Sequence, residues 1–269
     1  MGARANLSQQ AAGSEPILLE RLIPRGDPAA AEDIVGGLAR DDRWRSHPER
    51  PYLMLNMISS VDGRVSIGGR SRPLGSRADR ALFHALRSAV DAVMVGAGTA
   101  RTERYGRMIR EASRRRERVG RGLSEEPLAC IVSGRLALPA DLPLLGDPAA
   151  RVVILTSSTA SLPATVAQID YVRTGREGRV DLPAALAELR ERFAVGTLLC
   201  EGGPHLNSQL LVAGLVDELF LSLSPQLAGD SGPGETLRIL AGVELQSPVG
   251  LELLGALRSD SQLFLRYAV

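Results

Sequence analysis

The sequence of 269 residues lacks lysine, since all 32 residues counted as Lys and Arg are arginines. This absence excludes any mechanism that needs a lysine base or a lysine Schiff base, and we attribute it to composition bias rather than to function. The two cysteines (Cys130, Cys200) and three histidines (His47, His84, His205) have no C-x-x-C spacing and predict no metal site. Each cysteine ends an apolar run, which is typical of a buried, unpaired thiol.

The sequence also has neither a strong net charge nor a long apolar run. The formal net charge is +1, which argues against a nucleic-acid or acidic-surface partner. No run approaches the ~20 residues of a membrane span, and residues 1–16 contain no apolar core of the length that a signal peptide needs. We therefore expect a soluble, cytoplasmic protein, and the 44% hydrophobic content is enough for a sizeable core.

Short apolar runs alternate with amphipathic stretches along most of the chain. Most runs show no in/out alternation, as expected of parallel strands that are covered on both faces. The predicted strands are Tyr52–Ile58, Ala92–Val95, Leu128–Val132, Val152–Thr156, Ile169–Val172, Thr197–Cys200, Glu218–Ser224, Leu251–Leu254 and Leu263–Tyr267. The last two are joined by the short polar stretch 258–261, which predicts an antiparallel hairpin at a sheet edge.

Helices are predicted between these strands. The stretch Ser76–Ala89 begins with a capping-box spacing, Ser76 followed by Asp79. The stretches 183–193 and 204–212 have similar helical patterns. The alternation predicts an α/β fold with a mostly parallel central sheet. We expect one domain at 51–269, with residues 1–50 as an extension that packs on it and carries one weak helix near 29–40.

Two glycine turns are the first candidates for a functional site. Gly96 and Gly98 follow an apolar strand, but Arg101 stands where a dinucleotide-binding G-x-G-x-x-G motif needs its third glycine. In the second turn, Glu201 follows the end of a predicted strand, and Gly202 and Gly203 precede the predicted start of a helix at Pro204. The free N–H groups at such a helix start suit a phosphate or pyrophosphate, although two glycines can also form an ordinary tight turn.

A third segment gives these turns a family context. The order S-x-D-G-R at 60–64, G-x-G-T at 96–99 and E-G-G-x-x-L-N-x-x-L at 201–210 resembles the reductase domain of riboflavin biosynthesis, which is the C-terminal half of the bifunctional pyrimidine deaminase-reductase. The resemblance runs from about residue 51 to 269. No deaminase zinc signature is present, so a stand-alone reductase is expected.

The resemblance implies a dihydrofolate reductase-like fold and NADPH as the cofactor. It implies that Thr99 contacts the nicotinamide nucleotide, that the turn after Glu201 cradles the pyrophosphate, and that Ser133 binds the cofactor. Arg135, with no acidic residue beside it, suits a 2′-phosphate. The expected cofactor-binding residues are Gly96, Gly98, Thr99, Glu103, Ser133, Arg135, Gly202, Gly203, Pro204, His205, Leu206 and Asn207, with Ser208 and Gln209 completing the cradle.

On the substrate side, the resemblance implies a phosphorylated ribosylaminopyrimidinone that is reduced at ribose C1′. The expected catalytic residues are Glu201 and Asp62, the latter with an open structural alternative. The expected substrate-binding residues are Asn56, Ser71, Arg87, Arg107 and Arg110. Arginine suits a phosphate because its guanidinium can donate two parallel hydrogen bonds. The family also implies a homodimer.

The sequence departs from the family pattern on the substrate side. Asn56 stands where the riboflavin reductases usually carry a lysine, Pro73 where they have a tryptophan, and residues 103–105 (Glu-Arg-Tyr) replace D-D-P. Three hypotheses therefore stay open: the riboflavin-pathway pyrimidine reductase, a related NADPH reductase with a pterin- or dihydrofolate-like substrate, and a non-catalytic NADPH-binding protein.

Overall fold

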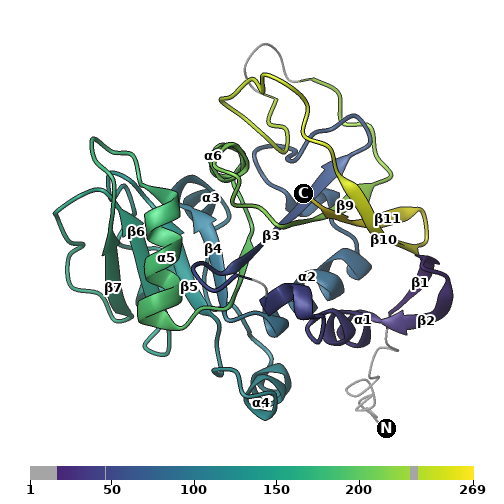
Figure 1. Cartoon of the computed structure of the whole chain (residues 1–269), viewed down its shortest axis with the longest axis horizontal. Helices are drawn as coiled ribbons and strands as arrows, with labels where there is room; N and C mark the ends of the chain where they lie inside the picture. Colours follow the sequence, from purple (N-terminus) through teal and green to yellow (C-terminus); the bar gives the residue numbers. More distant parts are fainter. Residues whose placement is uncertain (1–16, 46, 231–235) are drawn as a thin grey trace, which may run out of the picture.

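The computed structural model describes residues 17–45, 47–230 and 236–269, so the signal-peptide question at 1–16 lies outside the described residues. One sheet of eleven strands crosses the described part of the chain in the order β2-β1-β10-β11-β9-β3-β8-β4-β5-β6-β7 (Figure 1). The strands are β1 (Leu18–Ile23), β2 (Gly26–Ala30), β3 (Tyr52–Ser60), β4 (Ala92–Gly96), β5 (Leu128–Val132), β6 (Arg151–Thr156), β7 (Gln168–Arg173), β8 (Thr197–Cys200), β9 (Glu218–Ser224), β10 (Glu252–Ser259) and β11 (Gln262–Ala268).

The sheet has a parallel part and an antiparallel part. All neighbours from β9 to β7 pair in parallel, whereas β11, β10, β1 and β2 continue from β9 in antiparallel pairs. The predicted mostly parallel α/β sheet with a C-terminal antiparallel hairpin is thus confirmed. Among the described residues, no helix is long and apolar enough to cross a membrane.

Helices cover both faces of the sheet, and each face has its own core. The helices are α1 (Ala31–Leu38), α2 (Arg77–Ala89), α3 (Ala97–Thr102), α4 (Ala112–Gly120), α5 (Leu182–Phe193) and α6 (Pro204–Val212), with short 3-10 turns at Asp42–Arg45, Arg72–Leu74 and Pro143–Gly146. Residues of α1, α2 and α3 belong to one buried cluster, and residues of α5 and α6 belong to the other. Cys130 and Cys200 are buried and unpaired, as predicted.

The C-terminal hairpin corrects two sequence predictions. The strand predicted at Leu251–Leu254 runs from Glu252 to Ser259, so part of the polar stretch taken for a linker is strand. The hairpin also does not lie at the sheet edge, because β10 pairs with β1, and β1 with β2. The pairing of β1 with β10 joins residues more than two hundred positions apart, so no local sequence pattern predicts it. The described N-terminal residues therefore extend the sheet, while the boundary at residue 50 stays a prediction.

Arg118 of α4 ties this arginine-rich helix to α2. Its side chain is fully buried, and its NH1 atom donates to the carbonyls of Arg87 and Val90 at 3.1 and 2.8 Å. Its Nε donates to the carbonyl of Ser124 at 2.9 Å. A guanidinium thus satisfies carbonyls at the C-terminal end of α2, where a positive charge is favourable. Burial lowers the pKa of Arg118 to about 10, so the group is still charged at neutral pH.

Replacing Arg118 with methionine is expected to destabilise the fold by about 3 kcal/mol, because buried carbonyls at the end of α2 lose a charged donor. Urea denaturation followed by circular dichroism measures this change. Arg116→Met is the matched control, since Arg116 is exposed on the same helix, and it should stay within about 0.5 kcal/mol of the parent. Equal stabilities of the two variants would contradict the role assigned to Arg118.

Candidate functional site: a nucleotide cavity at the strand ends

The two glycine turns found in the sequence meet at the carboxyl ends of β4 and β8. The backbone N–H of Gly96 donates to the carbonyl of Gly202 at 2.7 Å. A Cβ on Gly203 would lie 2.5 Å from Oγ1 of Thr99, and a Cβ on Gly96 would lie 3.5 Å from the nitrogen of Gly203. Gly202 has a φ of +84°, which favours glycine. Side chains are absent here because the two turns pack directly on each other.

A cavity of about 1600 Å³ opens beside these turns. Gly96 and Gly203 are the N-caps of α3 and α6, and neither helix has a side-chain cap. Backbone N–H groups of two neighbouring helix starts therefore lie at the cavity, where they favour an anion. The expected cofactor residues that line it are Gly96, Gly98, Thr99, Glu103, Ser133, Arg135, Gly203, Pro204, His205, Leu206 and Gln209.

Ser133 and Arg135 lie at the end of β5, at the same edge of the sheet. Ser133 is buried, and its backbone N–H donates to the carbonyl of Leu155 at 2.9 Å. The Arg135 side chain packs on Gly178, where a Cβ would lie only 2.7 Å from Nε. Among the described residues, Arg135 forms no ion pair. The turn thus holds a free guanidinium beside the cavity, as an anionic ligand requires.

Three of the expected cofactor residues do not line the cavity. Asn207 is fully buried, and its amide donates to the carbonyl of Ile239 at 3.0 Å. The hydroxyl of Ser208 donates to the carbonyls of Pro204 and Ala241. Gly202 contributes its carbonyl to the bond from Gly96. These residues of the E-G-G-x-x-L-N motif hold the turn and the segment 239–241 in place, because their polar atoms face the interior.

Asp62, for which the sequence left a catalytic and a structural role open, binds a neighbouring loop. It does not line the cavity, and its carboxylate accepts from the hydroxyl of Ser60 and the backbone N–H groups of Ala228 and Gly229. These hydrogen bonds, that of Ser60 foremost, lower the pKa of Asp62 to about 2. The aspartate of the S-x-D-G-R motif anchors a neighbouring loop, because its oxygens are already occupied by donors.

Glu201 lies at the cavity in a closed polar cluster. Its two carboxylate oxygens accept from Nε and NH2 of Arg87 at 2.6 and 2.7 Å, and the hydroxyl of Tyr105 donates to it at 2.6 Å. Burial disfavours the charge on Arg87, but the attraction of Glu201 outweighs it and raises the pKa of Arg87. Burial and the charge of Glu201 raise the pKa of Tyr105. Glu201 does not cap the following helix, because the N-cap of α6 is Gly203 and it has no side-chain cap.

Ser71 and Glu103, expected on opposite sides of the site, are bound to each other. The backbone N–H and the hydroxyl of Ser71 donate to Oε1 of Glu103 at 2.9 and 3.0 Å. Both residues line the cavity, as does Asn56 of β3. The bond fixes the loop before α2 against the C-terminal end of α3, so Glu103 shapes the cavity wall.

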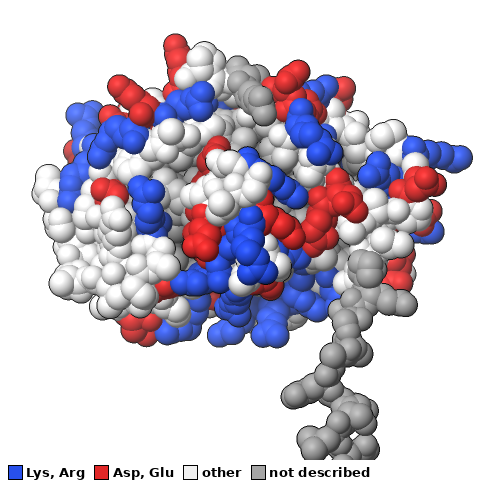
Figure 2. Space-filling model, turned by 90° about the horizontal axis from the view of Figure 1, so that it is seen from below, with Lys and Arg blue, Asp and Glu red and all other residues white. Residues whose placement is uncertain are grey.

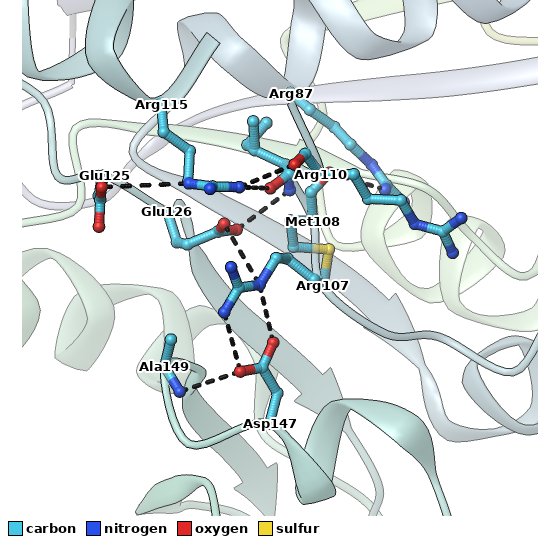
Figure 3. A network of polar contacts seen from close by, with 10 residues as sticks. Arg87, Arg107, Met108, Arg110, Arg115, Glu125, Glu126, Asp147 and Ala149 are labelled. Carbon is cyan, nitrogen blue, oxygen red and sulfur yellow. Dashed lines mark hydrogen bonds and ion pairs between the residues drawn. The ribbon is translucent and has the colours of Figure 1, made fainter. Parts of the chain in front are cut away.

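Arg107 and Arg110 lie close in sequence but differ in what holds them (Figure 3). Arg107 donates from Nε and NH2 to the two oxygens of Asp147 at 2.9 and 3.0 Å. The side chain of Arg110 has no hydrogen-bond or ion-pair partner among the described residues, is exposed, and lines the cavity. Arg110 is therefore the one of the pair whose guanidinium is free to bind a phosphate.

The backbone that carries Arg110 is held rigidly. The N–H of Ile109 donates to Glu126 at 3.0 Å, and NH1 of Arg115 donates to the carbonyls of Ile109 and Arg110 at 3.0 and 2.9 Å (Figure 3). Blue and red side chains are interspersed on the face seen from below (Figure 2). Arg114 forms ion pairs with Glu32 and Glu111, and Arg115 with Glu125. Both arginines thus hold neighbouring segments together.

The sequence did not single out two cavity residues for function. Tyr105 was noted only as a departure from the family pattern, and Asp79 only as part of a capping box. The sequence around these two residues does not indicate a role in the site, because their positions depend on contacts with residues on β9 or just after β8. Tyr105 contacts Glu201, and Asp79 contacts Ser222.

Fold and cavity together define an α/β domain that is built to hold an anionic, nucleotide-like ligand at the ends of its parallel strands. The model of the RibD C-terminal domain matches residues 51–264. The chain belongs to this family, the reductase family that the sequence motifs resemble.

Curated and structural relatives agree with this assignment. Over 183 residues, the chain is 32% identical to the 2,5-diamino-6-ribosylamino-4(3H)-pyrimidinone 5′-phosphate reductase of Archaeoglobus fulgidus. This match covers 67% of this chain and 83% of the relative. The enzyme of the same name from Methanothermobacter thermautotrophicus is 28% identical, and the match covers 82% of this chain and 99% of that enzyme. The crystal structure of a pyrimidine reductase-like protein from Corynebacterium diphtheriae superposes on this chain with a TM-score of 0.73 at 24% identity. The superposition covers 90% of this chain and 99% of that protein. The predicted reductase fold is thereby confirmed.

Proposed function

We propose that the protein is an NADPH-dependent reductase that converts 2,5-diamino-6-ribosylamino-4(3H)-pyrimidinone 5′-phosphate to its ribitylamino form by hydride transfer to ribose C1′. The two archaeal relatives carry this substrate in their names. The single observation that carries the proposal is the cavity itself: uncapped helix starts lie at one side, and the unpaired guanidinium of Arg110 lies on its wall. A dinucleotide and a phosphorylated substrate both need such groups.

The cofactor fits the residues that are present. Gly96 and Gly203 line the cavity without side chains, so a pyrophosphate could approach the backbone at the start of α6 closely. Thr99 would face the nicotinamide nucleotide, and Arg135 would bind the 2′-phosphate. When bound, NADPH supplies a hydride. The protein contributes by holding the acceptor carbon at about 3–3.5 Å from the hydride donor.

Each remaining group of the substrate side then has a defined task. Arg110 binds the ribose phosphate, while Asn56 and Ser71 contact the polar edge of the substrate. Glu201 keeps the guanidinium of Arg87 and the hydroxyl of Tyr105 in fixed positions. Its negative charge stabilises the positive charge that develops on the imine nitrogen of the ring-opened ribosylamine as that nitrogen takes up a proton. We further propose a homodimer in the cytoplasm.

Steady-state NADPH oxidation, measured in parallel with the ribosylaminopyrimidinone phosphate and with dihydrofolate, tests the proposed function. We expect turnover with the pyrimidine phosphate and little with dihydrofolate. Preference for dihydrofolate would instead support the related reductase that Asn56 and the altered residues 103–105 left open. Tight NADPH binding without turnover of either substrate would support a binding protein and contradict the proposal.

A preference for NADPH over NADH is expected because Arg135 is unpaired and no carboxylate stands beside Ser133 to bind a ribose diol. Arg135→Ala should weaken NADPH binding about tenfold or more, since one charge-assisted contact is worth roughly 1.5–3 kcal/mol, and should leave NADH unchanged. Ser133→Asp should also reduce the difference between the affinities for NADPH and NADH. Fluorescence titration measures both affinities.

Arg176→Ala is the matched control for this experiment, because Arg176 is exposed on the neighbouring loop and does not line the cavity. It should leave both cofactor affinities unchanged. Equal affinities of the parent protein for NADPH and NADH would contradict the assignment of Arg135.

A further inference from the structure

Asp79 has a carboxyl group that the helix it begins does not use. Ser76 accepts the backbone N–H of Asp79 at 3.1 Å, which is one half of the predicted capping box. The carboxyl of Asp79 is directed elsewhere: it forms a side-chain hydrogen bond with Ser222 of β9, and its Oδ2 lies 2.8 Å from the place of a Cβ on Gly75. Asp79 lines the large cavity together with Asn56.

The other carboxyl groups along the cavity have different partners or positions. Glu201 is bound to Arg87 and Tyr105, and Glu103 to Ser71. Asp181 accepts the N–H of Ala184 as the N-cap of α5, and Glu111 is exposed. Among the described residues that line the cavity, Asp79 and Glu103 are thus the partly buried carboxyls without an ion-pair partner, and Glu103 already accepts two hydrogen bonds from Ser71.

The surroundings of Asp79 favour its protonated form. Burial raises the pKa of Asp79, and the hydrogen bond of Ser222 and the charge of Arg80 only partly oppose this. From β9 the Asp79 carboxyl is faced by Ser222 and from the preceding loop by Gly75, both uncharged, and the charged group that acts on it is Arg80 of its own helix. Asn56 lies two residues before Ile58, the register partner of Ser222, and so on the same face of β3.

We infer that Asp79 is the general acid of the reduction, donating a proton to the imine nitrogen as ribose C1′ receives the hydride. This inference rests on the proposed function. The hydride brings the electron pair of the new C1′–H bond, the π electrons of the C=N bond move to nitrogen, and nitrogen takes the proton of the Asp79 carboxyl. Bound NADPH would supply the hydride and become NADP⁺, and a proton from solvent restores the Asp79 carboxyl.

Asp79→Asn is expected to lower kcat about a hundredfold while KM and NADPH affinity change by no more than a few-fold. In the parent protein, kcat should fall as pH rises through the pKa of Asp79, because only the protonated carboxyl can donate, and this decline should be absent in Asp79→Asn. The backbone N–H that binds Ser76 remains, so the start of α2 is preserved. Asp27→Asn, at an exposed position of β2, is the matched control.

Ser222→Ala provides a second test that keeps the carboxyl in place. It removes a hydrogen bond that favours the charged form, so the decline of kcat should move to higher pH, which a purely structural role would not cause. Carbon-13 NMR titration of the Asp79 carboxyl, which needs no turnover of substrate, should give the same pKa as the pH profile of kcat. It should show the same upward shift of that pKa in Ser222→Ala.

The outcomes separate this inference from the proposed function. Failure of the parent protein to reduce the pyrimidine phosphate would contradict the proposed function and, with it, the proton transfer to that imine. Normal kcat in a folded Asp79→Asn, or a carboxyl pKa at or below its ordinary value, would overturn the role of Asp79 alone, even where the parent protein reduces the pyrimidine.

Discussion

Replacing Gly203 with valine is expected to abolish NADPH binding and leave the protein folded. The backbone of Gly203 is extended, with φ −84° and ψ −176°, which valine adopts readily. A Cβ there would lie 2.5 Å from Oγ1 of Thr99, so Thr99 must rotate away. The branched side chain then fills the space in front of the α6 start, where the pyrophosphate is expected. Fluorescence titration with NADPH measures the loss, and circular dichroism reports the fold.

Gly120→Val serves as the control for this variant. Gly120 ends α4 on the exposed surface, and a Cβ there would meet no atom within 4 Å. This control should bind NADPH as the parent does. An unchanged NADPH affinity in folded Gly203→Val would mean that the E-G-G turn is only a tight connection between β8 and α6.

Replacing Glu201 with glutamine is expected to cut turnover about a hundredfold while NADPH affinity stays within a few-fold. A glutamine has one acceptor oxygen, so it cannot accept from both nitrogens of Arg87 and from Tyr105 as the carboxylate does. Arg87 and Tyr105 lose their fixed positions, and the negative charge beside the substrate is lost. Because the buried charge of Arg87 then has no opposite charge beside it, the free energy of unfolding should also fall by about 3 kcal/mol.

Two further variants separate these effects. Glu188→Gln, on the exposed face of α5, should change neither turnover nor stability, because its ion pair with Arg192 is exposed. Tyr105→Phe removes only one of the hydrogen bonds to Glu201 and should lower turnover less than Glu201→Gln does. Normal turnover of a folded Glu201→Gln protein would limit Glu201 to holding Arg87.

The elements of the fold could be predicted where local patterns carry the information. Buried parallel strands need apolar residues on both faces, so β4, β5 and β8 stand out as short continuous runs. The start of α2 could also be predicted, because Ser76 caps it through a hydrogen bond to Asp79, which is only three residues further along the chain. The sequence does not predict β1 and β2, since β1 is stabilised by pairing with β10, and β2 by pairing with β1, and neither has a pattern of its own.

The candidate site was predictable in residue type but not in role. Glycines at 96, 202 and 203 marked the cofactor side because a close approach of two backbones tolerates no side chain. The sequence could not distinguish Arg107 from Arg110, since only the distant Asp147 determines which guanidinium is already bound. For the same reason, Asp62 was taken for a catalytic residue, whereas the loop at 228–229 uses its oxygens.

By itself, the sequence determined the alternation of strands and helices, the glycine turns and the chemistry available without lysine, since these depend on residues that are near neighbours or on composition. Tertiary structure alone decided which charged groups are paired and which remain free. Glu201 meets Arg87 across 114 positions, and Asp79 meets Ser222 across the space between α2 and β9. The physical reason is that a carboxylate or guanidinium takes its protonation state and its function from the partners and burial that folding gives it.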